Sequence, residues 1–599
     1  MPKRGLFNPY TGYVQQPRNW LDIHEHNVDS TDIENPITDF ESAVKLYDSL
    51  IRLDLHFHES RAVYAAKNIA FSITEEHNKK IMFSFDAARS DFTLNVNDHV
   101  FIEVLKNVNG FCKRWSYAAG SVRSITEYIA EVDVHQYFNK VEIDTDQLCL
   151  VCNKVNYGMY GDQLKAIDVV KEHSSILQKL AYGEQIVTES EPETFDDGLE
   201  FPFDTDQKLA LKQMTSAATT TFVLIGPPGT GKTTIIIQAI ARLVEKGKRI
   251  LVATSSNIAA DAFTNRFLER CNDNDCVFRL MKATRDFSKT DDKMKVISGF
   301  ENCNGEWEYR PPDSVDRYSV VITTLGMSYK LRTMCEKEFS HIFIDEAGEA
   351  SELNLWMFLA NRGKDKNTRL ILCGDTTLLG PQNDVEQLNK YNSAYKKSML
   401  QRLVETPQFK SDPRLMVRLS MNYRLHKSIV DVMSAMIEDP ITTSENYTED
   451  VNLSNITSQT SSRVIFQNVK SEYEEMKQIL EYYVKLQNHF SDTDIGIITP
   501  HKSQAALIQE KVGLESKVMI DAVQQFRGAQ RRVVIISCTL DSDNLVHLKI
   551  DPEWINMAIS RAQSLVIIIG RASAVDVLPE GKLRSPGLDE ALKFEALTQ

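Results

Sequence analysis

Hydrophobic residues follow two different patterns along the first 180 residues of the chain. Residues 40–70 repeat apolar side chains every three to four positions, which predicts an amphipathic helix. Its apolar face would hold Val44, Tyr47, Leu50, Ile51 and Leu55. From about 80 to 155, apolar and polar residues alternate in short runs between Gly, Asn and Asp turns, which predicts a small β-barrel. Residues 162–180 return to a helical pattern.

After an acidic linker at 188–198, the pattern changes to short apolar runs that alternate with helical stretches. One series of runs lies at 250–253, 320–322, 342–344 and 370–373. A second series lies at 464–466, 495–498, 533–536 and 565–569. This alternation predicts an α/β fold with two domains, each built on a parallel sheet.

Composition narrows the class of protein. The 599 residues are 42% hydrophobic and 25% charged, which is typical of globular domains. No run of 18 apolar residues exists and the N-terminus has no apolar signal segment, so we expect neither a membrane span nor secretion. Nine scattered cysteines fit a reducing compartment. Cys149 and Cys152 have C-x-x-C spacing, but alternation around them indicates a strand rather than a metal site.

The net charge of −15 argues against a protein coated with basic surface. It does not exclude nucleic acid as a partner, because a binding groove depends on local charge.

One octapeptide carries the strongest chemical signal. The stretch from Gly226 to Thr233, GPPGTGKT, fits the phosphate-binding P-loop. Glycines let backbone N–H groups turn toward a polyphosphate, Lys232 supplies a charge for the β- and γ-phosphates, and Thr233 offers a hydroxyl to Mg²⁺. An apolar run precedes the loop and a helical stretch follows it, as the motif requires. The predicted nucleotide-binding residues here are Gly226, Gly229, Thr230, Gly231, Lys232, Thr233 and Thr234.

Two acids complete this chemistry. Asp345 and Glu346 follow a buried hydrophobic run, so Asp345 would hold Mg²⁺ and Glu346 would orient the attacking water. Positive charge at the γ-phosphate would come from Arg424 and Arg561 in the second α/β domain.

An ordered series of further segments resembles the motifs of superfamily 1 helicases, in the subgroup that includes the nonsense-mediated-decay helicase. These segments lie at 203–210, 250–261, 320–324, 374–381, 422–426, 495–504, 526–530 and 556–562. Within that subgroup, Asp345-Glu-Ala-Gly348 and Asn422-Tyr-Arg424 resemble the Armitage-type RNA helicases of RNA silencing.

The resemblance implies two tandem RecA-like P-loop motor domains behind an N-terminal helical stalk and small β-barrel. It implies a monomeric, ATP- and Mg²⁺-dependent motor that moves 5′→3′ on single-stranded RNA. It also implies RNA-silencing or other ribonucleoprotein partners, and a cytoplasmic location that includes ribonucleoprotein granules. The expected boundaries are 1–79 for the extension and stalk, 80–160 for the barrel, 161–200 for a helix and linker, 201–405 and 406–580 for the motor domains, and 581–599 for a tail.

The same resemblance assigns further site residues. Gln207 would read adenine, and Tyr423 would also lie against the nucleotide. Backbone and hydroxyl contacts to the nucleic-acid phosphates would come from Ser256, Asn257, Thr323, Thr324, Thr499, Pro500 and His501. The alternative for the Ser and Thr positions is local capping of turns.

Four positions depart from the family pattern: Glu349, Leu378, Arg527 and Gln530. Leu378 replaces a glutamine and cannot donate a hydrogen bond to phosphate, a contact worth about 1.5–3 kcal/mol. Two alternatives therefore stay open: an RNA clamp or scaffold with weak turnover, and a DNA helicase of the same superfamily.

Overall fold

The computed structural model describes the chain in segments. The described residues are 40–61, 63–73, 79–84, 99–108, 111–125, 129–137, 148–153, 157–172, 202–216, 220–270, 274–281, 290, 292–303, 306–360, 368–381, 397–437, 439–445, 456, 463–500, 502–513, 516–526, 528–538 and 552–570. The N-terminal extension, the acidic linker and the C-terminal tail lie outside them, as do His501 and Arg527. No described helix is both long enough and apolar enough to cross a membrane.

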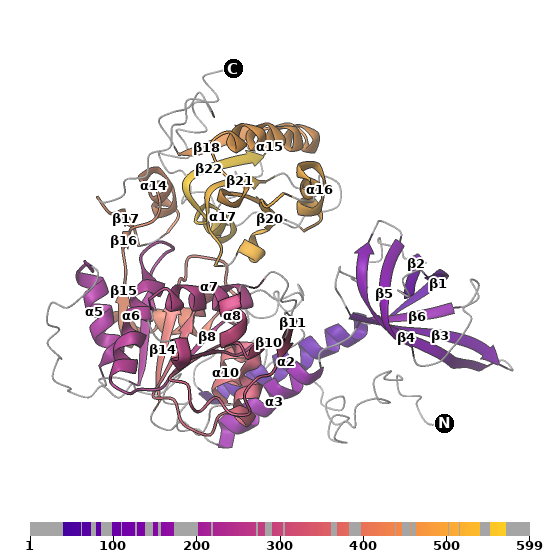
Figure 1. Ribbon diagram of the computed structural model, residues 1–599, viewed down its shortest axis with the longest axis horizontal. Coiled ribbons are helices and arrows are strands. Elements are labelled where there is room, and N and C mark those ends of the chain that lie inside the picture. The colour runs from indigo at the N-terminus through magenta and orange to yellow at the C-terminus, as the bar shows by residue number, and fades with distance from the viewer. Residues whose placement is uncertain are drawn as a thin grey trace. The chain divides into compact units, whose positions relative to one another are not determined.

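The chain divides into two compact units, and the first contains residues 1–167 and 383–393. Helix α2 (Phe40–Arg61) buries Val44, Tyr47, Leu50 and Ile51, the face that the sequence predicts. Six strands follow and close into an antiparallel barrel in the order β1-β2-β5-β4-β3-β6 (Figure 1). They are β1 (Val63–Ile73), β2 (Lys79–Ser84), β3 (His99–Val108), β4 (Phe111–Ile125), β5 (Ile129–Tyr137) and β6 (Leu148–Asn153).

The helix predicted at 40–70 is too long, because the last part of this segment forms strand β1. It ends at Arg61 rather than near Ala70, because Val63–Ile73 pairs with both β2 and β6. A helical period over this segment was outweighed by these non-local strand contacts. The strand predicted at Cys149–Cys152 is β6. Helix α3 (Tyr157–Glu172) begins five residues before the predicted start, and the predicted stretch beyond it lies outside the described residues.

The second unit contains residues 168–382 and 394–599. Its first sheet has seven parallel strands in the order β15-β7-β14-β13-β8-β12-β9. These are β7 (Thr221–Ile225), β8 (Ile250–Thr254), β9 (Val277–Arg279), β12 (Val320–Thr324), β13 (His341–Asp345), β14 (Arg369–Gly374) and β15 (Met416–Arg418). The four predicted runs are β8, β12, β13 and β14. Their aliphatic and β-branched residues are buried on both faces, as a sheet covered on two sides requires.

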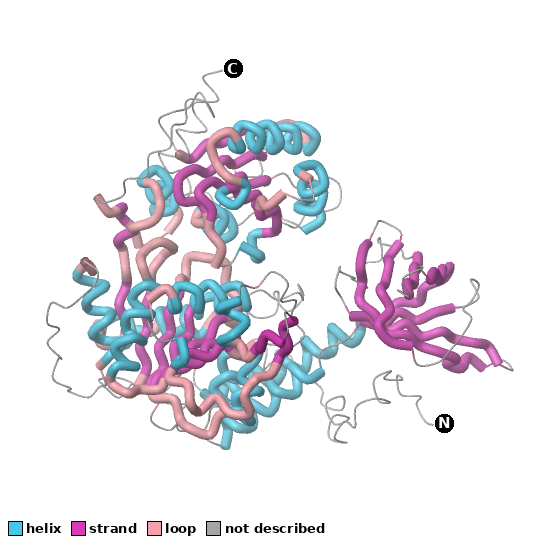
Figure 2. The backbone as a smooth tube through the Cα atoms, in the orientation of Figure 1, coloured by secondary structure: helices cyan, strands magenta, loops and turns pink. Residues whose placement is uncertain are grey.

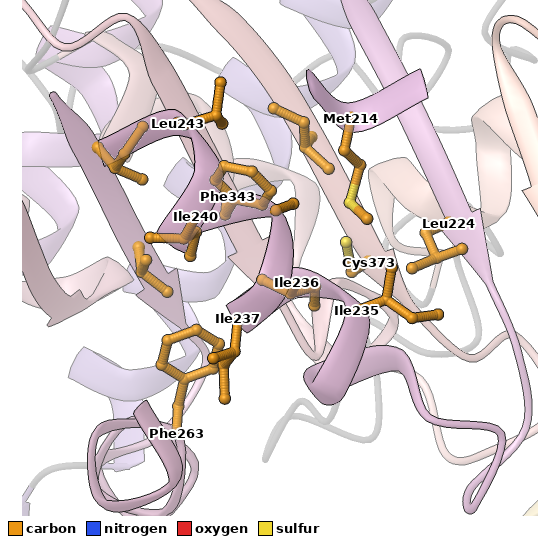
Figure 3. Packing of buried hydrophobic residues seen from close by; sticks show 14 of the residues in the cluster. Met214, Leu224, Ile235, Ile236, Ile237, Ile240, Leu243, Phe263, Phe343 and Cys373 are labelled. Carbon is orange, nitrogen blue, oxygen red and sulfur yellow. The ribbon is translucent and has the colours of Figure 1, made fainter. Parts of the chain in front are cut away.

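Helices cover this sheet (Figure 2). They are α5 (Thr205–Thr215), α6 (Lys232–Glu245), α7 (Asn257–Leu268), α8 (Asp292–Ile297), α9 (Ser328–Met334), α10 (Glu352–Ala360), α12 (Met399–Glu405) and α13 (Pro407–Ser411). A small hairpin, β10 (Phe300–Cys303) and β11 (Glu306–Tyr309), follows α8. In Figure 3, Ile235, Ile236 and Ile240 of α6 pack against Phe343 and Cys373 of the central strands. This core fixes α6 beneath the P-loop.

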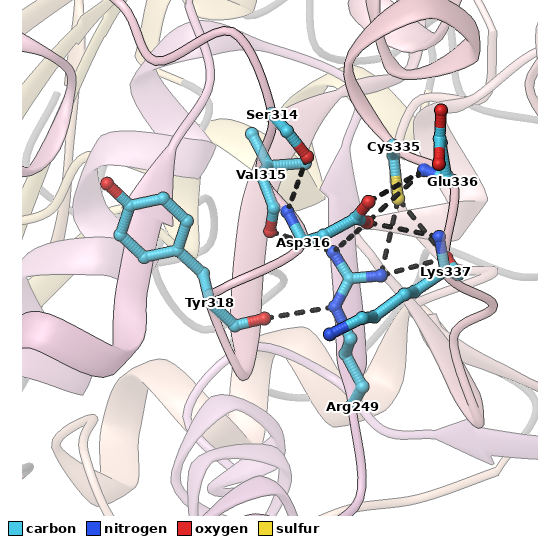
Figure 4. Close-up of polar contacts among 8 residues, drawn as sticks. All are labelled: Arg249, Ser314, Val315, Asp316, Tyr318, Cys335, Glu336 and Lys337. Atoms are coloured by element: carbon cyan, nitrogen blue, oxygen red, sulfur yellow. Dashed lines mark hydrogen bonds and ion pairs between the residues drawn. The ribbon is translucent and has the colours of Figure 1, made fainter.

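A polar network fixes the opposite, amino-terminal edge of the same sheet. Arg249, directly before β8, donates to the carbonyl oxygens of Val315 (2.8 Å), Tyr318 (3.0 Å) and Lys337 (2.8 Å). Its guanidinium also lies 3.4 Å from a carboxylate oxygen of Asp316 (Figure 4). Burial raises the pKa of Asp316, but N–H groups of Lys337 and Glu336 donate to the carboxylate and hold the pKa below its ordinary value. One side chain therefore joins two loops to the strand that supports them.

The second sheet has five parallel strands in the order β18-β22-β21-β19-β20. They are β18 (Val464–Asn468), β19 (Ile495–Thr499), β20 (Met519–Ala522), β21 (Arg531–Ser537) and β22 (Ala562–Gly570). All four predicted runs of the second series fall in this sheet. Alternate residues of β22 enter two different apolar clusters, one on each face. The helices are α14 (Lys427–Ala435), α15 (Glu472–Gln487), α16 (Lys502–Val512) and α17 (Pro552–Ile559), and a two-stranded pair joins β16 (Met421–Asn422) to β17 (Thr442–Thr443).

Two parallel α/β sheets are therefore confirmed, but the boundary between them lies later than the expected 405/406. Strand β15 pairs with β7 of the first sheet, so the first domain extends to Arg418. The crossing to the second domain occurs at 419–420, directly before the Asn422-Tyr-Arg424 motif.

Candidate functional site

The site lies at the carboxyl ends of β7, β13 and β14, where parallel strands of one sheet place their loops side by side. A cavity of about 300 Å³ opens there, within the second unit, between the first sheet and the loops of the second domain. Its lining includes the predicted residues Gly229, Gly231, Lys232, Thr233, Thr234, Asp345, Glu346, Arg424 and Arg561. Residues far apart in sequence thus meet in one place.

The P-loop has the predicted strand–loop–helix context. Gly229 and Gly231 adopt positive φ values of 89° and 87°, which favour glycine, and Lys232 begins α6. The Lys232 ammonium donates to the carbonyl oxygens of Gly226 (2.5 Å) and Pro227 (3.2 Å). The P-loop is thus curved around the Lys232 ammonium without a bound nucleotide. A phosphate bound in this loop would lie at the N-terminus of α6, where helix N–H groups favour an anion.

Gln207 lies behind this loop. Its side-chain amide donates to the Thr230 carbonyl (3.0 Å), and its oxygen accepts from the Asp204 N–H (3.2 Å) in a capping box at the start of α5. Tyr423 is more than one-third exposed, and its hydroxyl donates to Asp204 at 2.5 Å. Both residues therefore belong to one group of contacts beside the P-loop, and their role toward adenine stays a prediction.

The two acids sit where the sequence places them. The Thr233 hydroxyl lies 3.5 Å from an oxygen of Asp345. Burial, followed by the charge of Glu346, raises the pKa of Asp345 to about 6, while the nearby Lys232 opposes this shift. Glu346 adopts a left-handed backbone with φ of 57°, the single such residue other than glycine in the described part of the chain. Strained conformations of this kind concentrate at functional sites.

A hydroxyl and carboxylate oxygens at this place are the hard ligands that Mg²⁺ prefers. Thr233 and Asp345 would hold such an ion, and Asp375 at the end of β14 adds a carboxylate that the sequence analysis did not select. One Asp375 oxygen accepts from the Thr377 N–H (2.8 Å) and hydroxyl (2.7 Å), and the other is buried without a hydrogen-bond partner. Burial raises the pKa of this carboxyl.

The structure gives a steric reason for glycine at position 348 of the Asp-Glu-Ala-Gly motif. A Cβ added at Gly348 would lie 2.1 Å from the Asp375 carbonyl oxygen, so only glycine allows the loops after β13 and β14 to approach so closely. The departure at Glu349 has a structural partner as well: its carboxylate accepts from the Ser255 hydroxyl at 3.3 Å.

We expect Gly348→Ala to lower the free energy of unfolding by about 1–3 kcal/mol, because the added methyl must displace the Asp375 backbone. Urea denaturation measures this change. Gly326→Ala is the matched control, since a Cβ there meets no atom within 4 Å. Equal denaturation midpoints for the two variants would contradict the proposed close approach.

The arginines reach the cavity from the second domain through a bridge that the sequence analysis did not assign. The Asn422 side chain is fully buried, donates to the Pro228 carbonyl (2.7 Å), and accepts from the N–H groups of Arg424 (3.0 Å) and Leu425 (2.9 Å). The Tyr423 N–H also donates to the Gly229 carbonyl at 2.9 Å. The backbone of Arg424 is therefore tied to the P-loop.

Four arginines line the cavity: Arg424 and Arg561 of the second domain, Arg266 of α7, and Arg270 directly after that helix. Burial and the neighbouring charges of Arg266 and Arg561 lower the pKa of Arg424 to about 9, so it stays protonated at neutral pH. Arg561 is buried and donates to the Met557 carbonyl at 3.2 Å. The sequence motifs did not include Arg266. It lies seven residues after Ala259, so both residues are on the helix face that lines the cavity.

The departures Leu378 and Gln530 both line the cavity. Leu378 is 7% exposed and packs in the apolar cluster that contains Leu425 and Phe526 of the second domain. The side-chain N–H₂ of Asn556 donates to the Thr377 carbonyl at 3.1 Å. The loop after β14 therefore joins the two domains by packing and by a hydrogen bond, in place of a polar contact from residue 378.

The predicted nucleic-acid residues lie at the carboxyl ends of β8, β12 and β19, but most of their side chains serve the fold. The Ser256 hydroxyl caps α7, and the Thr323 hydroxyl is buried and donates to the Leu280 carbonyl at 3.3 Å. Thr324 and Thr499 are also buried, whereas Asn257 is exposed. Capping is thus what the structure shows at Ser256, and contacts to phosphate from these loops stay a prediction.

Taken together, the fold and the cavity define a tandem α/β protein with a P-loop nucleotide site between its two domains. Two protein families, each described as an AAA domain, match residues 202–306 and 395–573. Relatives include the mov-10-B.1 protein of Danio rerio, 28% identical over 58% of this chain and 39% of its own. RNA helicase Mov10l1 of Mus musculus is 27% identical over 61% of this chain and 34% of its own. These matches support a superfamily 1 helicase of the MOV-10, or Armitage, type.

The chain spans less than half of the length of these relatives. Among solved structures, S. cerevisiae Dbp5 bound to RNA and ADP BeF3 shares 14% identity over 72% of this chain and 90% of that chain, with a TM-score of 0.37.

Proposed function

We propose that this protein is an ATP-dependent RNA helicase or ribonucleoprotein-remodelling translocase. The observation that carries the proposal is the shared cavity: Lys232, Thr233 and two acids come from one sheet, while Arg424 and Arg561 come from the other domain. An ATP site divided in this way makes hydrolysis depend on how the two domains close.

Each group would have a defined task. Lys232 and the N-terminus of α6 would neutralise the β- and γ-phosphates, and Glu346 would orient water for in-line attack on the γ-phosphorus. Mg²⁺ held by Thr233 and Asp345 would neutralise developing charge. Arg424 and Arg561 would stabilise the transition state. Asn422 would couple movement of the P-loop to the second domain through its hydrogen bond to the Pro228 carbonyl.

Single-stranded RNA is the proposed track. Asn257 and Thr324 lie at the carboxyl ends of the neighbouring strands β8 and β12, and Pro500 follows β19 of the second sheet. These segments would contact phosphates through backbone groups, without reading bases. The family resemblance supports 5′→3′ movement by a monomer, a cytoplasmic location that includes ribonucleoprotein granules, and partners in RNA silencing.

ATP turnover, titrated with poly-U RNA and with single-stranded DNA of the same length, tests this function. We expect RNA to stimulate turnover and DNA to do so less. Stimulation by DNA alone would favour the DNA helicase. Equal turnover with and without nucleic acid would exclude the motor.

A second candidate is an RNA clamp that uses ATP as a structural ligand. Leu378 favours it, because an apolar side chain fills the place of a phosphate-contacting amide. Tight, ATP-dependent RNA binding with negligible turnover would support the clamp over the translocase.

A further inference from the structure

One positive side chain at the cavity has no role in the motif series. Arg266 lies in the last turn of α7, and the cavity-lining residues of that helix share one face at spacings of three to four. These residues are Ala259, Ala262, Phe263 and Arg266, and the cavity is also lined by Glu269 and Arg270, which directly follow the helix. Arg266 is therefore directed to the same space as Lys232 and Arg424.

Within the described part of the chain, the Arg266 guanidinium makes no hydrogen bond and no ion pair. Its charge nevertheless acts inside the site, because it opposes the rise in the pKa of Asp345 and contributes to the fall in the pKa of Arg424. The cavity is lined by five basic side chains, the four arginines and Lys232, and by four acidic ones, Glu269, Asp345, Glu346 and Asp375. An anion bound among the basic groups would lower the repulsion between them. Arg266, which has no hydrogen-bonded partner among the described residues, is thus available to a phosphate group in this cavity.

Leu378 cannot make a hydrogen bond to a phosphate. It lines the same cavity, and its side chain has no donor for a terminal phosphate. Gln530, another departure from the family pattern, lies two residues after Gly528, and a Cβ on that glycine would lie 3.4 Å from the Ala259 Cα. The second domain is thus in close contact with α7, the helix that carries Arg266.

We propose that Arg266 contacts the γ-phosphate of bound ATP and replaces the hydrogen-bond donor that Leu378 lacks. This assignment rests on the proposed ATP site and deepens it: the cavity distinguishes a triphosphate from a diphosphate through α7 of the first domain.

The position of α7 gives this contact a further consequence. The helix starts at the Ser256–Asn257 loop, one of the proposed RNA contacts, and Arg279 of β9 fixes its first turns by reaching Asp261 (3.1 Å) and Asn257 (3.2 Å). RNA at the first turn of α7 and the γ-phosphate at its last turn would act on one rigid element. RNA binding would then favour the triphosphate state through Arg266.

Nucleotide affinity tests the assignment without relying on turnover. The dissociation constants of fluorescent ADP and of the β,γ-imido analogue of ATP, both with Mg²⁺, would be measured by anisotropy for the full chain. We expect Arg266→Gln to weaken the triphosphate analogue by about ten- to a hundredfold, since a charge-assisted hydrogen bond is lost, and to leave ADP affinity unchanged. Arg414→Gln, an exposed arginine paired with Asp412, is the charge-matched control and should change neither constant.

Two further variants sharpen the test. Arg266→Lys, which keeps the charge and the fold, should lose less triphosphate affinity than Arg266→Gln. Leu378→Gln, added to Arg266→Gln, should restore part of the lost affinity because it returns a donor to the same phosphate. Equal losses for ADP and the analogue, or no loss for either, would overturn the assignment.

The outcomes also separate this assignment from the proposed function. If RNA stimulates turnover in the wild type and Arg266→Gln leaves triphosphate affinity intact, the motor stands and the Arg266 contact is wrong. If the wild type binds the analogue through Arg266 but never hydrolyses ATP, the contact stands and the motor is wrong. A wild type that binds neither nucleotide would overturn both.

Discussion

Lys232→Ala should reduce ATP turnover by about 100- to 1000-fold, the usual cost of removing one donor that stabilises charge in a transition state. The side chain has a second task in the structure, since its ammonium donates to the carbonyl oxygens of Gly226 and Pro227. Its loss would leave those two carbonyls without this donor and loosen the loop before any nucleotide binds. We therefore expect weaker binding of ADP and of the triphosphate analogue, together with the fall in turnover.

Steady-state turnover with saturating RNA, combined with anisotropy of a fluorescent nucleotide, measures both effects. Lys248→Ala removes an exposed lysine just after the same helix and serves as the control. Turnover by Lys232→Ala at the rate of the control would contradict the assignment of this cavity as the ATP site.

Arg424→Ala should reduce turnover by about 1000-fold or more, as expected for an arginine that neutralises the transferring phosphoryl group. Unlike Lys232, the Arg424 side chain has no hydrogen bond to another described residue, and its neighbours Arg266 and Arg561 carry the same charge. Its removal relieves repulsion in the nucleotide-free protein. We therefore expect the loss of turnover without any loss of folding stability and with little change in ADP affinity.

Single-turnover hydrolysis and urea denaturation separate these quantities. Arg424→Lys keeps the charge but loses the planar fork of donors, so its turnover should lie between those of the alanine variant and the wild type. A parallel fall of stability and turnover in Arg424→Ala would indicate that Arg424 supports the domain interface rather than the reaction.

Local sequence was sufficient for most strands of both sheets and for the P-loop, but it did not predict β9, β15 and β20, which lie at sheet edges. Runs such as 342–344 and 533–536 are buried on both faces, so every residue in them must be apolar and the pattern is continuous. Glycines at 229 and 231 mark backbone conformations that other residues rarely adopt. The segment at 63–73 was predicted wrongly because its conformation depends on pairing with β2 and β6, whose residues are distant in sequence.

Contacts between distant segments decided the rest of the site. No spacing rule links Asn422 to Pro228, Gly348 to the Asp375 backbone, or Arg266 to Arg424, because each pair meets only after the chain crosses between strands or domains. Ser256 and Thr323 matched nucleic-acid motifs in sequence, but the structure uses their hydroxyls for capping and for an internal hydrogen bond. A motif specifies a residue type at a position, and only the fold decides which partner that residue meets.

The sequence by itself therefore determined the α/β class, the P-loop and the acids that follow β13, because these depend on short-range periodicity and on glycine geometry. The tertiary structure decided that Arg424, Arg561 and Arg266 face one cavity with Lys232, that Asn422 ties the second domain to the P-loop, and that Leu378 packs at the domain junction. The physical reason is that charge and packing act over distances of a few ångströms in space, whatever the separation along the chain.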